Sequence, residues 1–364
     1  MGALIQFFID HPLAIPLFLI MFTAIIAVHE FGHYLTARLL GMRVLEFAFG
    51  FPPRIAAIRH AGIDYSINAI PFGGFVRILG QDDFSIDQRG AGDPGSFTSK
   101  PWWAQAIVLA AGVFMNFVLA VIVLTAAFAM GTVAPTGQVR VEEVAPSSPA
   151  ATAGIQPGDI VVSVDGKPIT RMQDLVSYVT AHADKEVTIQ LQRNGRDLPP
   201  ITAVPRADPP PGEGPLGIKL GEVTSQVAMP LPDAFGQAVS LTGDVVGQIA
   251  ALPGELLSRG PGTQGPPPVG GPIQIFVVTA AVSQLGFATF LKLVGVISVN
   301  LGVLNIIPFP GLDGGRLFFV LLGAALRRRL SPQLEAAIHA VGFVLLLGLL
   351  VVVSVADIRR ATGG

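Results

Sequence analysis

Two histidines and a glutamate stand together in the segment His29-Glu30-Phe31-Gly32-His33. On a helix, residues four apart lie on one face, so both imidazoles can reach a single ion while Glu30 lies one position round. Two imidazoles beside a carboxylate are the groups that hold zinc and place a general base next to it. A chain with six His in 364 residues contains His-Glu-x-x-His by chance only about twice in a thousand sequences. The spacing therefore predicts a metal site.

The segment lies inside an apolar stretch, Pro12–Leu40. Two His and a Glu at membrane depth cost roughly several kcal/mol unless they pair or bind an ion. A polar cluster that merely packs helices together is the alternative. The motif and its apolar surroundings favour the metal site.

A catalytic zinc usually has three protein ligands and an open position for water. The chain has no Cys, so the third ligand is another His or a carboxylate. The best remaining candidate is Asp313, which follows two prolines and precedes two glycines in the segment Asn305–Gly315. A simple turn cap is the alternative role for Asp313. The other histidines lie outside any comparable motif: His11, His60, His182 and His339.

The composition indicates a membrane protein. Hydrophobic residues make up 51% of the chain and charged residues 13%, with a mean hydropathy of +0.61, whereas a soluble domain carries about 25% charge. A net charge of −2 leaves no basic surplus to neutralise phosphates, which excludes nucleic acid as a partner. The absence of Cys excludes disulfides and Cys-ligated zinc.

Four apolar stretches reach the length of about 20 residues that a membrane-spanning helix needs. They are Pro12–Leu40, Ala104–Met130, Leu285–Pro308 and Ala336–Val355. A further apolar run, Ile273–Val282, is too short to cross, so we expect it to be interfacial or re-entrant. The first stretch has no basic segment before it and no cleavage site after it, so we expect it to stay in the protein.

The basic residues predict the orientation. Lys and Arg gather in the loop after the first span and between the third and fourth spans, so both connections should face the cytoplasm. The first and third spans then run in the same direction. This places His29, His33 and Asp313 at a similar depth near the cytoplasmic side, and the long segment after the second span outside. Arg359 and Arg360 near the C-terminus count against this orientation.

The chain divides into four predicted regions. Residues 1–130 hold the first two spans with the metal motif and a cytoplasmic membrane-associated loop, and 131–206 form a separate extracytoplasmic domain. Residues 207–284 form a linker, an amphipathic helix after Asp233 and the interfacial segment, and 285–364 hold the last two spans.

The separate domain resembles a PDZ domain. The resemblance rests on Ala-Gly154-Ile-x-Pro-Gly158-Asp159-Ile, followed by Asp165-Gly166, and covers roughly 75 residues. PDZ domains add an extended chain or a C-terminus to a sheet edge. A steric plug over the membrane part is the alternative role.

Taken together, the motifs resemble the site-2 protease family of intramembrane zinc metalloproteases, in the bacterial form with a single PDZ domain. The resemblance rests on His-Glu-x-x-His in the first span, the PDZ-like insert after the second, and Asn-x-x-Pro-x-Pro-x-Leu-Asp-Gly-Gly at the third. It implies a polytopic α-helical membrane protein of about four spans with an inserted β-rich PDZ-like domain. By this resemblance His29, His33 and Asp313 bind Zn²⁺, Glu30 is the catalytic base, and Asn305 holds substrate.

The resemblance also implies substrates and a location. The expected substrates are transmembrane segments of single-span proteins already trimmed by another protease, such as anti-sigma factors, or remnant signal peptides. The expected location is a bacterial inner membrane. A Gly/Phe-rich hairpin in the loop 41–101 is predicted to clamp the unwound strand, although a membrane-hugging loop without substrate contact fits the composition equally well.

Two other functions remain, and the chain departs from the family pattern at two places, of which one is Gln274 in Gly271–Ile275, where the family has Gly. A zinc transporter needs ligands along a path, whereas these lie at one depth, and a PDZ membrane scaffold does not explain Glu30 beside two His. Family members often have Gly-Pro before the Asn of the second span, whereas Gly112–Asn116 lacks the proline. Because both changes lie outside the zinc motifs, we expect them to affect local packing rather than catalysis.

Overall fold

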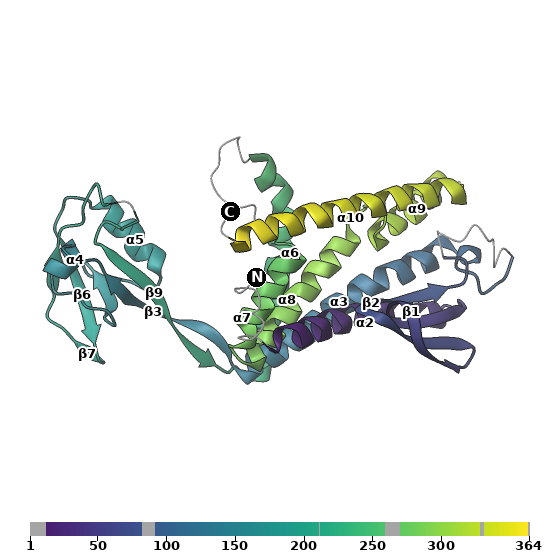
Figure 1. Ribbon diagram of the computed structural model, residues 1–364, viewed down its shortest axis with the longest axis horizontal. Helices are drawn as coiled ribbons and strands as arrows, with labels where there is room; N and C mark the ends of the chain where they lie inside the picture. Colours follow the sequence, from purple (N-terminus) through teal and green to yellow (C-terminus); the bar gives the residue numbers. More distant parts are fainter. Residues whose placement is uncertain (1–11, 82–91, 211, 259–269, 328–330, 363–364) are drawn as a thin grey trace. The chain divides into compact units, whose positions relative to one another are not determined.

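A computed structural model describes residues 12–81, 92–210, 212–258, 270–327 and 331–362 of the chain (Figure 1). The chain forms two compact units. The helical unit comprises Met1–Gly131 and Ala228–Gly364, and the β-rich unit comprises Thr132–Val227.

Four helices of the helical unit are long and apolar enough to cross a membrane, among the residues that the structure describes. They are α2 (Ala14–Leu39), α3 (Trp102–Met130), α8 (Phe287–Ile306) and α10 (Pro332–Thr362). The first three coincide with predicted spans to within two residues at each end, and α10 contains the predicted span Ala336–Val355 and extends beyond it at both ends. The expectation of a polytopic helical membrane protein with about four spans is therefore confirmed.

Helix α3 lies at the centre of this unit and packs against α2 and α8 (Figure 1). The contacts are close because glycines stand at both crossings. Gly32 of α2 lies against the carbonyl group of Ala111, and Gly295 of α8 lies against Leu124. Small residues of this kind let helix backbones approach in a membrane, where packing replaces the hydrophobic effect between helices.

Within the described residues the unit has three further α-helices: α6 (Leu231–Ser258), α7 (Pro272–Ser283) and α9 (Asp313–Leu326). Helix α6 packs on α3 and α8 and buries Ala234, Ala238 and Val245. It lies where an amphipathic helix was predicted after Asp233, but it begins two residues earlier, at Leu231. With 12 residues, α7 is too short to cross a bilayer. The predicted linker before it lies mostly outside the described residues.

The segment after α2 forms an antiparallel hairpin of β1 (Val44–His60) and β2 (Ile63–Ile78), followed by a 3₁₀ turn at Phe97–Ser99. The hairpin is longer than the short one predicted. The reason is the turn, because Ala61 and Gly62 both have positive φ angles, 49° and 79°. This backbone conformation closes a two-residue hairpin loop whose twist matches that of the strands. The loop lies after the Phe-rich residues in the chain, so β1 extends past them.

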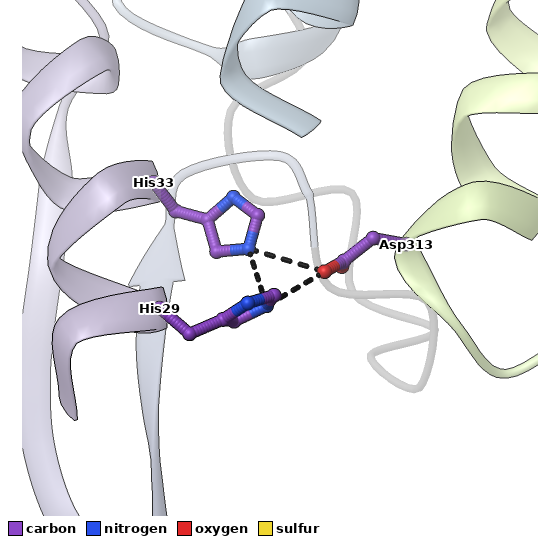
Figure 2. Close-up of side chains that lie close together, drawn as sticks. All are labelled: His29, His33 and Asp313. Atoms are coloured by element: carbon purple, nitrogen blue, oxygen red, sulfur yellow. Dashed lines mark hydrogen bonds and ion pairs between the residues drawn. The ribbon is translucent and has the colours of Figure 1, made fainter. Parts of the chain in front are cut away.

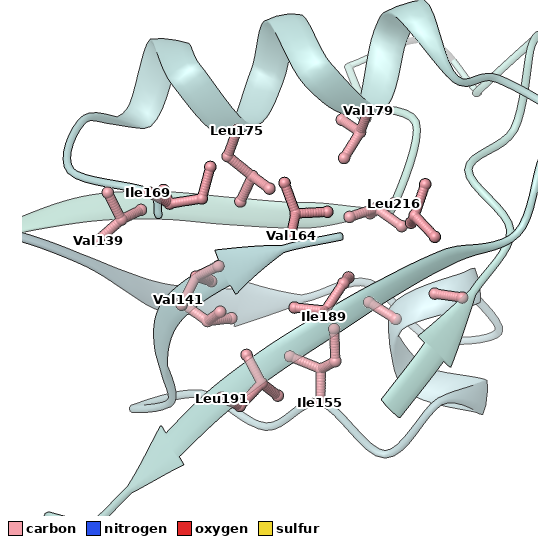
Figure 3. Close-up of a cluster of buried hydrophobic side chains, with 14 residues drawn as sticks. Val139, Val141, Ile155, Val164, Ile169, Leu175, Val179, Ile189, Leu191 and Leu216 are labelled. Carbon is pink, nitrogen blue, oxygen red and sulfur yellow. The ribbon is translucent and has the colours of Figure 1, made fainter. Parts of the chain in front are cut away.

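The β-rich unit is a twisted antiparallel sheet with the order β7-β6-β4-β3-β9, and β5 and β8 pair with β4 and β6. Figure 3 shows the core, in which Leu175 and Val179 of the helix α5 pack on sheet residues such as Ile189. The elements are β3 (Thr132–Val144), α4 (Pro149–Thr152), β4 (Ile160–Val164), β5 (Lys167–Pro168), α5 (Met172–Ala181), β6 (Val187–Arg193), β7 (Arg196–Asp197), β8 (Ile201–Ala203) and β9 (Ile218–Val227).

The predicted end of this domain at residue 206 is wrong, since the compact unit runs to Val227. Strand β9 pairs with β3 from Ile218 opposite Val144 to Val227 opposite Thr132. Leu216, in the stretch assigned to a linker, is 2% exposed in the core. The Pro- and Gly-rich residues before β9 are typical of a linker, so the sequence did not predict the strand that follows them and pairs with β3.

Candidate metal centre

Two imidazoles and one carboxylate converge inside the helical unit. His29 and His33 project from one face of α2 and are 5% and 4% exposed, and Asp313 is the first residue of α9. Figure 2 shows the three side chains pointing toward one another. Oδ2 of Asp313 lies 2.8 Å from Nε2 of His29 and 3.2 Å from Nε2 of His33, and the two Nε2 atoms are 3.1 Å apart.

These separations fit a zinc ion. Ligands at the usual zinc distances in a tetrahedral arrangement lie about 3.3 Å from one another, close to the three measured distances. Each residue offers one ligand atom, and all ligand atoms of the group lie within 4.8 Å of one another. Two nitrogens and one carboxylate oxygen also match the donor set of catalytic zinc sites, which leave one position open.

Helix α3 contacts the Nδ1 atoms of both imidazoles and so orients the two rings. Nδ1–H of His33 donates to the carbonyl oxygen of Val108 at 2.7 Å, and Nδ1 of His29 lies 3.3 Å from Nδ2 of Asn116. Gly112 stands between these two positions, and a side chain there would overlap both rings. Such outer contacts fix the ring orientation of metal-binding histidines.

The loop before Asp313 is held by α10. Gly311 has a φ angle of 98°, a conformation that glycine adopts without strain. Its backbone N–H donates to Nδ1 of His339 at 2.9 Å. Gly314 and Gly315 then lie against the backbone of the preceding loop, where a side chain would collide with carbonyl groups. Helix α9 therefore starts at a fixed position, with Asp313 facing α2.

Glu30 is tied to the hairpin. Its Oε2 accepts the backbone N–H of Val76 in β2 at 3.0 Å. About two turns earlier on the same face of α2, Thr23 donates its hydroxyl to the carbonyl oxygen of Pro71 at 3.1 Å. Strand β2 therefore runs along α2 beside the carboxylate of Glu30, which lies between His29 and His33 in the sequence.

Asn305 lies in the last turn of α8 and is partly exposed. The hydrogen bonds that orient the imidazoles do not involve Asn305, and their partners are Val108 and Asn116 of α3. The sequence motifs did not reveal this part of the site. Only the Gly112–Asn116 comparison with the family pointed to it, and it suggested packing alone. His339 gave no signal, because its partner is a backbone group.

The fold and the site together are those of a helical membrane protein with a buried cluster of His29, His33 and Asp313 that could hold a metal ion. The model of Peptidase family M50 matches residues 17–349. Three relatives match nearly end to end and are named as zinc metalloproteases. One from Clostridium perfringens is 32% identical over 93% of this chain and 97% of its own. One from Rhizobium meliloti is 33% identical over 96% and 97%. RasP of Oceanobacillus iheyensis is 28% identical over 94% and 98%.

Two solved structures are similar to a short part of the chain. The PDZ domain of an SdrC-like protein from Listeria monocytogenes is 22% identical, with a TM-score of 0.21, covering 24% of this chain and 90% of that one. The HtrA-type protease AlgW is 27% identical, with a TM-score of 0.20, covering 22% and 24%.

The chain belongs to Peptidase family M50, and the resemblance to the site-2 proteases is confirmed. It is a multi-pass intramembrane zinc metalloprotease that uses Zn²⁺ and acts on membrane proteins. A zinc transporter or a PDZ scaffold is not favoured.

Proposed function

We propose that His29, His33 and Asp313 hold the zinc ion and that Glu30 is the catalytic base. The observation that carries this assignment is the convergence of the three ligand atoms at 2.8–3.2 Å. Zinc bound there supplies a Lewis acid that polarises water and the scissile carbonyl. The Glu30 carboxylate takes the proton from the attacking water and returns it to the departing amide nitrogen.

The hairpin β1–β2 is proposed to present the substrate. A transmembrane helix hides its carbonyl groups in hydrogen bonds between residues four apart, so it must unwind before cleavage. An unwound segment can pair with the edge of a strand. The bonds from Val76 to Glu30 and from Thr23 to Pro71 support this role, because they hold β2 along α2 next to the proposed base. Asn305, eight residues before Asp313, is proposed as a second contact to the substrate.

The proposed substrates are transmembrane segments of single-span proteins that another protease has already shortened, such as anti-sigma factors, or remnant signal peptides. The PDZ-like domain (Thr132–Val227) is proposed to bind an extended peptide or a C-terminus. Strand β9 supports this proposal because it ends the sheet order, which leaves one edge for an added strand. Exclusion of untrimmed proteins is the alternative role of the domain.

The protein is proposed to lie in a bacterial inner membrane with the metal centre near the cytoplasm and the PDZ-like domain outside. The absence of Cys makes a direct test possible. Single cysteines replace Ala57 in the hairpin and Glu186 in the PDZ-like domain, both exposed. In intact spheroplasts a membrane-impermeant maleimide should label the cysteine at 186 and leave the one at 57 unlabelled.

The catalytic assignment is tested with Glu30→Gln, which keeps the shape of the side chain and removes its basicity. Wild type and variant are purified in detergent, and zinc per chain and cleavage of a single-span substrate with a shortened outer domain are measured. Both should hold about one zinc, and only the wild type should cut. Asp233→Asn, an equivalent change on the exposed start of α6, is the control. Cleavage by Glu30→Gln at the wild-type rate would overturn the assignment.

A further inference from the structure

Asn116 is a fully buried polar side chain of α3 at the back of the metal centre. It is 0% exposed, and its Nδ2 lies 3.3 Å from Nδ1 of His29. Among the described residues, its Oδ1 is buried without any hydrogen-bond partner. A buried amide that uses only its nitrogen side is costly, by about 1–3 kcal/mol for an unmet acceptor. This position therefore calls for an explanation.

The proton positions on His29 supply one. In the structure, Nε2 of His29 lies 2.8 Å from the Asp313 carboxylate, and the amide nitrogen of Asn116, which can only donate, faces Nδ1. A neutral imidazole that binds a metal through Nε2 must carry its proton on Nδ1. An amide NH₂ facing that N–H would place donor against donor. The carbonyl of Asn116 is the group that could accept it.

A half turn of the Asn116 amide group is enough to place its carbonyl oxygen opposite Nδ1 of His29. The oxygen and nitrogen of an Asn side chain exchange places by a half turn, and their assignment follows from the hydrogen-bond network. No partner of Oδ1 within the described chain opposes the turn. The backbone is fixed, because Ser298 of α8 donates its hydroxyl to the carbonyl oxygen of Asn116 at 2.9 Å. Asn116 is thus a rigidly placed group with a single free torsion beside His29.

His33 provides the comparison. Its Nδ1–H donates to the backbone carbonyl of Val108 at 2.7 Å, so the Nδ1 proton of this imidazole already has a fixed acceptor. Val108 and Asn116 are eight residues apart on α3, which is about two helical turns and places them on the same face. One face of α3 therefore supports both imidazoles, with a fixed acceptor for His33 and a rotatable one for His29.

We propose that Asn116 is a positioning residue that turns its amide when zinc binds, so that Oδ1 accepts the Nδ1 proton of His29. This inference rests on the proposed function of His29 as a zinc ligand. The partner of a ligating histidine typically contributes about 10–100-fold in metal affinity. Asn116 should act on zinc binding first, and on cleavage through it.

The test compares Asn116→Leu, which matches the size but has no acceptor, with Asn116→Asp, whose carboxylate accepts from Nδ1–H in either orientation. Zinc affinity is measured by competition with a chelator in detergent, together with the visible spectrum of the cobalt-substituted protein. We expect Asn116→Leu to weaken zinc binding about 10–100-fold and to alter the cobalt bands. Asn116→Asp should bind zinc within a few fold of the wild type.

Two reference variants make the result unambiguous. Thr279→Val removes another 0% exposed polar group, one whose hydroxyl donates to the carbonyl of Ile275 in its own helix, and should leave zinc affinity unchanged. His29→Ala tests the proposed ligand itself. If His29→Ala binds zinc normally, the proposed ligand set fails. If His29→Ala loses zinc while Asn116→Leu keeps wild-type affinity, or Asn116→Asp is as weak as Asn116→Leu, the role of Asn116 is overturned.

Discussion

Gly112 of α3 lies directly against the imidazole of His33, so closely that a methyl group at this position would overlap Nε2. The same methyl would lie 2.7 Å from Cε1 of His29. Nε2 is the proposed ligand atom. Because Gly112 has no side chain, α3 can pack closely against α2 without displacing this atom from the proposed metal position.

Gly112→Ala should therefore weaken zinc binding while the membrane helices still form. Forcing a methyl into a packed interior costs about 1–3 kcal/mol, and here the strain falls on both imidazoles. We expect zinc affinity to drop at least about tenfold, with cleavage falling in parallel, as measured by metal content after dialysis and by substrate cleavage. Gly243→Ala on α6, where a methyl meets nothing within 4 Å, is the matched control. Full zinc occupancy in Gly112→Ala would contradict the packing argument.

His339 should matter for activity although it lies outside the metal motifs. It is 2% exposed, and its Nδ1 accepts the N–H of Gly311, two residues before Asp313. His339→Leu leaves that backbone N–H without its acceptor, at a cost of about 1–3 kcal/mol, and loosens the loop. We expect cleavage to fall about tenfold with a lower unfolding temperature in detergent. His60→Leu, at the exposed end of β1, should change neither quantity.

The sequence predicted the metal motif and the spans because both are local patterns. The spacing of His29 and His33 follows from one helical turn, and each span is a long apolar run. The closeness of Asp313 to both imidazoles could be predicted as well, because two spans expected to run in the same direction bring these residues to one depth. These parts of the site depend on type and spacing, which can be recognised without coordinates.

The supports of the site could not be predicted in the same way. His33 bonds a backbone carbonyl of α3, and Gly311 bonds a side chain of α10. Such pairs depend on the rotation and offset of packed helices, which a single sequence does not state. The end of the PDZ-like domain was missed for a related reason. Strand β9 is defined by its pairing with β3, whereas the run before it has the composition of a linker.

Removal of zinc should stop cleavage without unfolding the protein. The groups at the centre are held by α3 and α10 through contacts that do not involve a metal, in contrast to small domains that fold only around zinc. A chelator should therefore abolish cleavage, whereas the circular dichroism signal at 222 nm should change by no more than about a tenth. Added zinc should restore activity. Loss of helical signal on chelation would show that zinc builds the fold.

The PDZ-like domain should depend on one buried ion pair. Asp159 is 0% exposed in its side chain, and Nε of Arg193 donates to Oδ1 of Asp159 at 2.7 Å. Burial alone raises the pKa of Asp159, but the hydrogen bonds from Arg193 and from the N–H of Gln156 outweigh it and hold this pKa below the ordinary value. The pair joins β6 to the start of β4. Asp159→Asn should destabilise the domain by about 1–3 kcal/mol at neutral pH.

The pH dependence of this difference follows from the sign of the shift. A carboxyl whose pKa is lower in the folded state contributes stability that is fully present above the unfolded pKa of about 3.9, and loses it as pH falls through the folded pKa. The measurement is urea unfolding of residues 132–227, whose core is complete within the unit, for wild type and Asp159→Asn. The difference in unfolding free energy should be constant from pH 7 to about pH 5 and should shrink steadily below about pH 4. A difference that does not change with pH would mean that packing around Asp159, and not its charge, stabilises the domain.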